Sequence, residues 1–366
     1  MPETHGRRRD ALRGLLTQAG VEALLVTDLL NIRYLTGFTG SNAALLLHAG
    51  GDEPTLFCTD GRYTTQAAAE VPDLATVVDR ASAAALARRA AAEVKTYGRT
   101  GFESQYVSVE EHETLKVRFD GVELVRTPGL VEKLRLVKDD AEVEALRRAC
   151  AAADRALHDL IEAGGLRPGR TELEVARDLE NRMLEHGSDG PSFDSIVAAG
   201  AHSAIPHHRP TGAELAEGDF LKLDFGATVE GYHSDMTRTV VLGEPADWQR
   251  EIYDLVHAAQ AAGSAAVKPG AEVSDVDAAA RSVITAAGRG EEFAHGLGHG
   301  VGLQIHEAPS LAATGVGTLS AGMAVTVEPG VYLAGRGGVR IEDTLVVRDS
   351  GPELLTLTTK DLVAVR

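Results

Sequence analysis

The sequence predicts a two-domain protein, with an α/β domain over residues 1–129 and a domain of two related helix-and-strand units over residues 130–366. Three observations support this prediction. Strand-like apolar runs alternate with helical stretches before residue 125, the pattern changes near residue 130, and the second part contains an internal repeat. A chain of 366 residues is long enough for about two domains at roughly 100–200 residues each.

The first domain opens with a helical pattern over residues 8–19 and continues with short apolar runs. We expect strands over residues 23–26, 43–47, 55–58, 76–78 and 122–125, and helices over residues 66–69 and 81–94. Strands that alternate with helices are typical of an α/β domain. The glycine-rich segment Gly37–Asn42 lacks the Lys-Ser/Thr ending of a phosphate-binding loop, so a phosphate site is not assigned to it.

The second domain begins with two predicted helices. Asp139 and Asp140 suit the positive end of a helix dipole, and apolar residues follow them at spacings of three and four until Gly164. Thr171 and Glu174 then form a capping-box pattern, which predicts a second helix that extends through residue 183.

An internal repeat follows these helices. Three pairs of segments match in the same order: 166–169 with 267–270, 217–226 with 321–330, and 234–241 with 341–347. Their offsets are 101, 104 and 107 residues, counted from Gly169 to Gly270, from Asp224 to Glu328 and from Asp235 to Glu342. Similar offsets in one order indicate a duplicated unit with pseudo-twofold symmetry, and two copies are too few for a solenoid.

Each copy of the repeat carries two carboxylates at equivalent places: Asp224 and Asp235 in the first, Glu328 and Glu342 in the second. Alternation along a strand places Asp224 and Glu328 opposite the apolar side chains of their strands, so the four acids converge if the copies pack face to face. A pair of like charges 4 Å apart costs about 4 kcal/mol at an intermediate dielectric. Two divalent cations such as Mn²⁺, Mg²⁺, Co²⁺ or Zn²⁺ would neutralise four carboxylates.

Three histidines lie close together among four glycines in the segment HGLGHGVGLQIHE, at His295, His299 and His306. The glycines disfavour the helix of an HExxH zinc protease and favour strands or a tight loop close to a site. We therefore expect at least one of these histidines to contribute to the site.

Composition excludes several classes of protein. Lys and Arg number 36 and Asp and Glu 54, so the net charge of −18 argues against a general nucleic-acid binder. Cys58 and Cys150 cannot form a disulfide framework and fit a reducing compartment. No signal-peptide core follows the charged N-terminus, and no apolar stretch reaches the roughly 18 residues of a membrane span. These features predict a cytoplasmic protein without a membrane partner.

Five motifs carry a resemblance to a known family: LDFGA at 223–227, SDMTRT at 234–239, GHGVGLQIHE at 298–307, VEPGVY at 327–332 and RIEDT at 340–344. This set resembles the Xaa-Pro peptidases, the family of aminopeptidase P and prolidase within the pita-bread metallopeptidases. The segments NIRYLTGFTGSN and TDGRY are similar to a creatinase-type N-terminal domain. The resemblance implies a creatinase-like domain, a pita-bread catalytic domain, peptide substrates that contain proline, and a homodimer.

The resemblance also implies a site with two divalent metal ions, of which Mn²⁺ is expected first and Co²⁺ or Zn²⁺ are alternatives. By resemblance, the metal ligands are Asp224, Asp235, His299, Glu328 and Glu342. Glu328 would transfer the proton during hydrolysis, and His207 and His306 would stabilise the oxyanion. The substrate-binding residues would be His207, His295, His306, Tyr332 and Arg340. The resemblance favours His207 over the adjacent His208, because the family's histidine lies seventeen residues before the first metal-binding Asp, which is Asp224 here.

Several alternatives stay open. The leading prediction is an Xaa-Pro aminopeptidase, and the first alternative is a prolidase that acts on dipeptides only, because both share these motifs. Methionine aminopeptidase uses the same ligands but lacks the additional N-terminal domain, and creatinase and inactive binding proteins of this fold do not need the full ligand set. Individually, Asp235 or Glu342 fits a solvated residue, His306 a hydrogen-bonded strand-end residue, and Arg340 an ion pair with a neighbouring acid.

Overall fold

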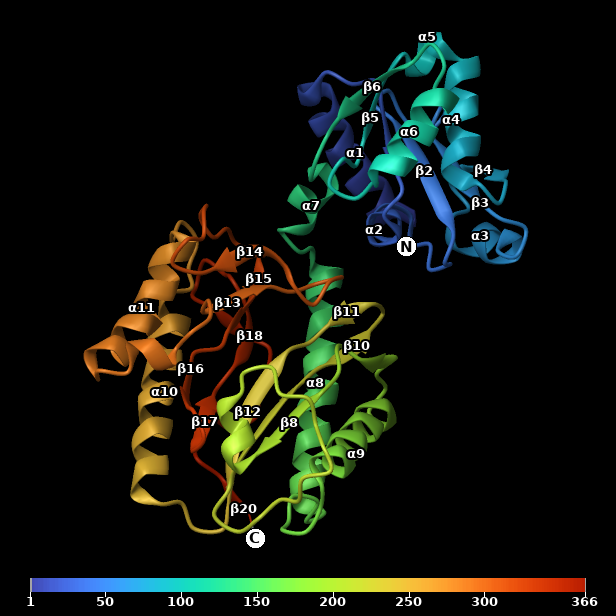
Figure 1. The fold of residues 1–366 in the computed structure, drawn as a ribbon. Helices are drawn as coiled ribbons and strands as arrows, with labels where there is room; N and C mark the ends of the chain where they lie inside the picture. Colours follow the sequence, from blue (N-terminus) through green and yellow to red (C-terminus); the bar gives the residue numbers. More distant parts are fainter. Residues whose placement is uncertain (1, 366) are drawn as a thin grey trace. The chain divides into compact units, whose positions relative to one another are not determined.

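The computed structural model describes residues 2–365, which divide into two compact units, 1–135 and 136–366 (Figure 1). The boundary predicted after residue 129 falls at the start of α7 (Leu130–Arg135), a helix that packs with the first unit. Among the described residues, no helix is long and apolar enough to cross a membrane.

The first unit is an α/β domain around one six-stranded sheet in the order β4-β3-β2-β1-β5-β6. Its strands are β1 (Ala23–Val26), β2 (Ala43–His48), β3 (Leu56–Thr59), β4 (Ala75–Val78), β5 (Arg99–Phe102) and β6 (Glu123–Arg126). Its helices are α1 (Pro2–Ala19), α2 (Leu29–Thr36), α3 (Thr64–Glu70), α4 (Ser82–Ala92), α5 (Val94–Tyr97), α6 (Val109–Arg118) and α7. The α/β prediction for this part of the chain is confirmed.

Several details of this unit differ from the sequence-based expectation: helices α2, α6 and α7 were not predicted, and the helix expected over residues 81–94 is divided into α4 and α5. Strand β5 was not predicted, because Arg99, Thr100 and Gly101 carry little apolar character, yet it pairs in parallel with both β1 and the edge strand β6. The glycine-rich segment that begins at Gly37 ends helix α2. Gly37 adopts a left-handed φ of 82° and its N–H donates to the carbonyl of Arg33, as in an αL cap.

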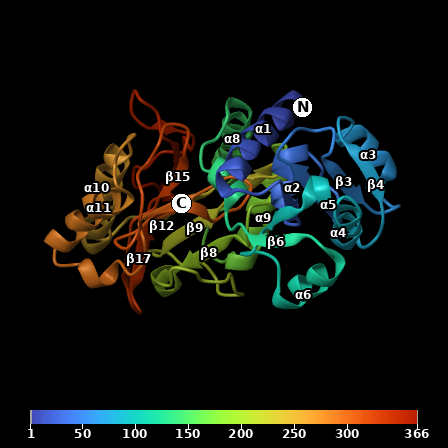
Figure 2. The same ribbon diagram turned by 90° about the horizontal axis from the view of Figure 1, so that it is seen from above.

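The second unit contains four long helices and two main sheets. The helices are α8 (Asp140–Glu162), α9 (Glu172–Glu185), α10 (Asp247–Ala266) and α11 (Val273–Ala286), with short 3₁₀ turns η1 (Gly200–Ala204) and η2 (Gly290–Glu292). Figures 1 and 2 show α8 and α9 on one side of the strands and α10 and α11 on the other. The capping box predicted at Thr171 forms, and Asp139, expected only as an acid at a helix start, also forms one with Glu142.

One main sheet has the order β20-β12-β9-β8 and the other β14-β13-β15-β18-β19. The first comprises β8 (Ile196–Ala199), β9 (Phe220–Phe225), β12 (Met236–Leu242) and β20 (Ala364–Val365). The second comprises β13 (Gly298–Gly300), β14 (Glu307–Leu311), β15 (Ala324–Val327), β18 (Asp343–Val346) and β19 (Glu353–Leu354). Smaller ribbons are formed by β7 (Gly190–Pro191), β10 (Ala227–Val229) and β11 (Tyr232–His233), and by β16 (Gly330–Leu333) with β17 (Gly337–Arg340).

The internal repeat is visible in the backbone of the second unit. Gly169 and Gly270, paired at one offset, have φ values of 85° and 82°. Gly218 and Gly322, paired at the next, have φ values of 86° and 90°. Left-handed turns at matching positions are a conformational requirement that glycine satisfies without strain, so the two copies share their chain path as well as their sequence pattern.

Each copy has its own hydrophobic core. Leu221, Leu223 and Phe225 of β9 are buried in the core beneath α8 and α9, as alternation predicted. Val325 and Val327 of β15 are buried in the core beneath α10 and α11. Because the helices cover one face of each strand pair, the opposite faces are left for polar residues, and these faces carry the site.

We predict that Leu157→Ala in α8 lowers the free energy of unfolding by about 2–5 kcal/mol, because Leu157 is 1% exposed within the first of these cores. Urea denaturation followed by circular dichroism measures this loss. Leu184→Ala in α9 is the control, since Leu184 is 48% exposed and its truncation leaves no cavity. Equal losses in the two variants would contradict the assignment of this core.

Candidate functional site

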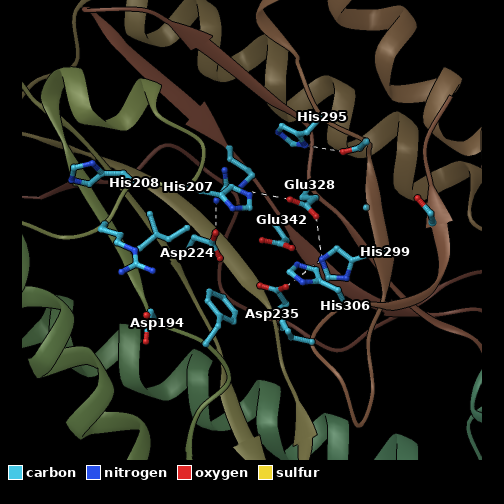
Figure 3. A pocket seen from close by; sticks show the side chains of 18 of the residues that line it. Asp194, His207, His208, Asp224, Asp235, His295, His299, His306, Glu328 and Glu342 are labelled. Atoms are coloured by element: carbon cyan, nitrogen blue, oxygen red, sulfur yellow. Dashed lines mark hydrogen bonds and ion pairs between the residues drawn. The ribbon is translucent and has the colours of Figure 1, made fainter. Parts of the chain in front are cut away.

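The predicted site residues lie around one cavity of about 630 Å³ within the second unit (Figure 3). All of them except Tyr332 line this cavity: His207, Asp224, Asp235, His295, His299, His306, Glu328, Arg340 and Glu342. Tyr332 is buried and contacts two of these residues instead. The sequence therefore identified residues that the fold brings together from both copies of the repeat.

Two antiparallel strand pairs place the four carboxylates. Asp224 is on β9, opposite Thr237 of β12, and Asp235 lies immediately before β12. Glu342 lies immediately before β18, which pairs with β15. Glu328 follows the last residue of β15, so it is at the strand end and not within the strand as expected.

Reciprocal hydrogen bonds join the two copies at this point. The N–H of Glu342 donates to the carbonyl of Thr237 at 3.1 Å, and the Thr237 hydroxyl donates to the Glu342 carboxylate at 2.6 Å. Thr344, the repeat partner of Thr237, donates its hydroxyl to the carbonyl of Asp235 at 2.9 Å. These bonds fix the spacing of Asp235 and Glu342 across the pseudo-twofold axis.

Burial makes the carboxylates costly to ionise. Asp235 is 4% exposed and Glu342 1% exposed. Burial first, and then the neighbouring carboxylates, raise the pKa of both groups well above their ordinary values. Burial also raises the pKa of Glu328 to about 7. The cluster therefore resists full ionisation unless further positive charge is present.

His299 points a ring nitrogen at this cluster. Its Nδ1 donates to the carbonyl of Gly300 at 3.0 Å, because a carbonyl oxygen can only accept. Its Nε2 is then an acceptor, 3.5 Å from Asp235 and 3.4 Å from Glu328. Burial lowers the pKa of His299 to about 4, so the ring is neutral near pH 7 and suited to coordinate a cation.

Arg340 provides the cation that contacts the cluster. Its guanidinium donates to the Asp224 carboxylate and, at 2.8 Å, to the Tyr332 hydroxyl. The Tyr332 hydroxyl lies 2.9 Å from Nε2 of His295, whose Nδ1 donates to a backbone carbonyl. Burial, followed by the charge of Arg340, lowers the pKa of His295 to about 4. The hydrogen-bond chain from Arg340 through Tyr332 therefore ends on the neutral imidazole of His295. Arg340 also forms the ion pair considered as its alternative role, and its partner is Asp224.

His207 and His306 are the exposed histidines of the cavity. The rings of His306 and His299 meet edge to face at 4.4 Å. Figure 3 shows His207 beside Asp224, whereas His208 is turned away from the carboxylates. His208 is buried, and its Nε2 contacts Glu172 at 2.9 Å. Burial, and then Arg340, lower the pKa of His207.

Sequence reasoning missed Glu172, His202 and Lys222, which lie behind the cavity wall. Glu172, with His202 and His208, forms a second group of potential ligand atoms. Lys222 is fully buried on β9, two residues before Asp224. Glu172 was overlooked because it lies in the first turn of a helix, where acids are common at the surface. Lys222 was overlooked because most of its neighbours in the strand are apolar.

The donor set fits divalent metal ions. The atoms that Asp235, His299 and Glu342 offer all lie within 4.8 Å of one another, and Asp224 and Glu328 border the same space. When ionised, these four carboxylates carry more negative charge than the one guanidinium of Arg340 balances. Carboxylate oxygens with one imidazole suit Mn²⁺, Co²⁺ and Zn²⁺.

We predict that Glu342→Gln stabilises the metal-free protein relative to the parent, and increasingly so as the pH rises from about 5 to about 8. A carboxyl group with a raised pKa stabilises the fold while it is protonated and loses that contribution on ionisation, whereas the amide never ionises. The gain should exceed about 1 kcal/mol, which corresponds to roughly one pKa unit.

Urea denaturation in the presence of a chelator at both pH values measures this gain. Glu185→Gln, at an exposed position of α9, is the control and should follow the parent. A difference between E342Q and the parent that does not change with pH would contradict the charge repulsion inferred for the cluster.

Comparison with known proteins agrees with this geometry. Metallopeptidase family M24 matches residues 144–349, and the Creatinase/Prolidase N-terminal domain matches residues 8–137. The uncharacterized peptidase YqhT of Bacillus subtilis is 40% identical over 356 residues, which cover 97% of this chain and 99% of that protein.

Two solved structures are similar over nearly the whole chain. An Xaa-Pro dipeptidase from Bacillus anthracis has a TM-score of 0.93 at 39% identity and covers 99% of this chain and 100% of its own. An X-Pro aminopeptidase from Thermotoga maritima has a TM-score of 0.88 at 33% identity, with coverages of 94% and 98%. The family resemblance found in the motifs is thus confirmed, and the chain belongs to metallopeptidase family M24, with a creatinase-like N-terminal domain followed by a pita-bread domain.

Proposed function

We propose that this protein is a metal-dependent peptidase that hydrolyses the bond between an N-terminal residue and a following proline. The observation that carries the proposal is the convergence of four carboxylates and His299 on one cavity that is also lined by His207 and His306. Both solved relatives described above carry names that specify Xaa-Pro substrates, which supports the same substrate class here.

In this proposal Asp224, Asp235, His299, Glu328 and Glu342 hold two divalent ions, for which Mn²⁺ is our first choice. Such ions, when bound, activate water and polarise the scissile carbonyl. The neutral Nε2 of His299 and the carboxylate oxygens around it supply the electron pairs that bind them. Arg340 holds Asp224 in place from the other side.

The remaining steps belong to side chains of the cavity. Glu328 accepts a proton from the attacking water and delivers it to the leaving proline nitrogen, which has no N–H of its own. His207 and His306 face the cavity and donate hydrogen bonds to the carbonyl oxygen as it gains charge. The acidic cluster attracts the free α-amine of the substrate, which accounts for selection of an N-terminus.

Two forms of this activity are candidates. The Thermotoga maritima relative, an X-Pro aminopeptidase, supports as the first candidate an Xaa-Pro aminopeptidase that accepts longer peptides. The high TM-score of the Bacillus anthracis relative, an Xaa-Pro dipeptidase, supports the dipeptidase as the second candidate. The two differ in substrate length and not in the chemistry of the bond.

We predict that Glu328→Gln lowers kcat for Xaa-Pro hydrolysis by about 10²–10⁴-fold, because the amide cannot accept the proton of the attacking water. Steady-state kinetics with bound metal measured in parallel provide the readout. Glu291→Gln, at an exposed position of η2, should retain the activity of the parent. Turnover near that of the parent in E328Q would exclude Glu328 as the proton carrier.

We also predict that the Mn²⁺-loaded protein cleaves Ala-Pro-Ala after the first alanine and that a chelator abolishes this activity until Mn²⁺ is restored. Chromatography with mass detection on Ala-Pro, Ala-Pro-Ala and Ala-Ala-Ala separates the alternatives. Cleavage of Ala-Pro alone would assign the dipeptidase. Equal cleavage of Ala-Ala-Ala, or full activity without metal, would overturn the proposal.

A further inference from the structure

The segment that carries His207 has little regular structure of its own. Residues 199–211, here called the His207 strap, leave β8, pass through the short turn η1 and contribute His207, His208 and Arg209 to the cavity wall. A segment of this kind needs contacts from outside itself to hold a side chain at one place, since backbone ladders do not fix it.

Glu172 supplies such contacts at both ends of the strap. It is fully buried at the first position of α9, and its two carboxylate oxygens accept five hydrogen bonds. Oε1 accepts from the Ala199 N–H and from Nδ1 of His202, each at 2.9 Å. Oε2 accepts from Nε2 of His208 at 2.9 Å, and from the N–H and hydroxyl of Thr211 at 2.9 and 2.7 Å.

This pattern is that of an ionised carboxylate used as a structural anchor. Burial opposes the charge, but the Ala199 N–H, the two histidines and Thr211 lower the pKa of Glu172 to about 2. The rings of His202 and His208 stack at 4.4 Å, each pointing to a different carboxylate oxygen. The N-terminal end of α9 adds a favourable dipole.

Two buried basic side chains hold the middle of the strap. Nζ of Lys222 donates to the carbonyls of Ile205 and Pro206 at 2.6 and 3.2 Å, and Arg340 donates to the Pro206 carbonyl at 3.2 Å. These two carbonyls immediately precede His207. The strap is therefore fixed by Lys222 and Arg340 directly before His207 and by Glu172 on either side of it.

We propose that Glu172 is a positioning residue that holds the His207 ring at the cavity through the strap, so that its effect on hydrolysis is transmitted by His207. The proposal rests on the proposed function, in which His207 stabilises the oxyanion. Glutamine cannot replace Glu172, because an amide has one acceptor oxygen and would turn its NH₂ group toward at least two of the five donors. Displacement of His207 by about 1 Å would cost roughly 100-fold in rate.

A double-mutant cycle with Glu172→Gln and His207→Ala tests this inference on the Mn²⁺-loaded, full-length protein with an Xaa-Pro-Yaa substrate. We expect E172Q to lower kcat by about 10- to 100-fold, with little change in KM and unchanged bound Mn²⁺. In the H207A background, E172Q should change kcat by less than about 2-fold, since there is no imidazole left to misplace. Glu174→Gln, two positions along on the exposed face of α9, is the matched control and should match the parent.

The possible outcomes separate this inference from the function on which it rests. If H207A itself retains activity, the proposed role of His207 is wrong. If H207A loses activity but E172Q does not, or if E172Q costs as much in H207A as in the parent, only the positioning role is overturned. Loss of bound Mn²⁺ in E172Q would mark Glu172 as a metal ligand and also overturn it.

A second variant keeps the test decisive if E172Q folds poorly. Thr211→Val removes the 2.7 Å hydroxyl contact with Glu172 and leaves the charge in place. T211V should lower kcat in the parent by a smaller factor than E172Q does, and it should have little effect on kcat in the H207A background. A loss that adds fully to that of H207A would contradict the positioning role.

Discussion

Repulsion among four clustered carboxylates, three of them buried, is the constraint on which the rest of the second unit depends. Burial and mutual proximity raise the pKa values of Asp235, Glu328 and Glu342, so the arrangement is costly without added positive charge. Folding energy from the two hydrophobic cores must hold these groups together against that cost. A site of this kind is poised to take up divalent cations, because their binding relieves a repulsion already built into the fold.

The duplication explains how four acids come together in one place. One strand pair with helices behind it can present two acids on its free face, and a second copy supplies the other two. The Thr237 hydroxyl of the first copy donates a hydrogen bond to the Glu342 carboxylate of the second. The Thr344 hydroxyl of the second copy donates to the backbone carbonyl of Asp235 in the first. Because these bonds are reciprocal, the distance across the pseudo-twofold axis is set by short, buried hydrogen bonds and does not rely on loop conformation.

Around this symmetric centre, the residues that would handle substrate are asymmetric. Arg340, Tyr332 and His295 form a connected chain in one copy only. His207 stands on an irregular strap that depends on Glu172 and Lys222. The duplication thus supplies the four carboxylates, whereas the residues proposed to recognise a peptide, which has a direction, belong to elements that are not repeated.

The amino-acid sequence was enough to predict the α/β character of the first unit, helices α8 and α9, the repeat with its four carboxylates, and the histidine cluster. His207, Tyr332 and Arg340 were expected only from the resemblance to the Xaa-Pro peptidases. Periodicity, capping patterns and regularly spaced carboxylates can be recognised from the order of the residues alone. Strand β5 and the anchors Glu172 and Lys222 were decided only by tertiary structure. Arg99–Phe102 becomes a strand because β1 and β6 flank it. The buried polar groups of Glu172 and Lys222 are stable only because distant segments supply their hydrogen-bond partners. Such partnerships have no signature in the residues that precede and follow them.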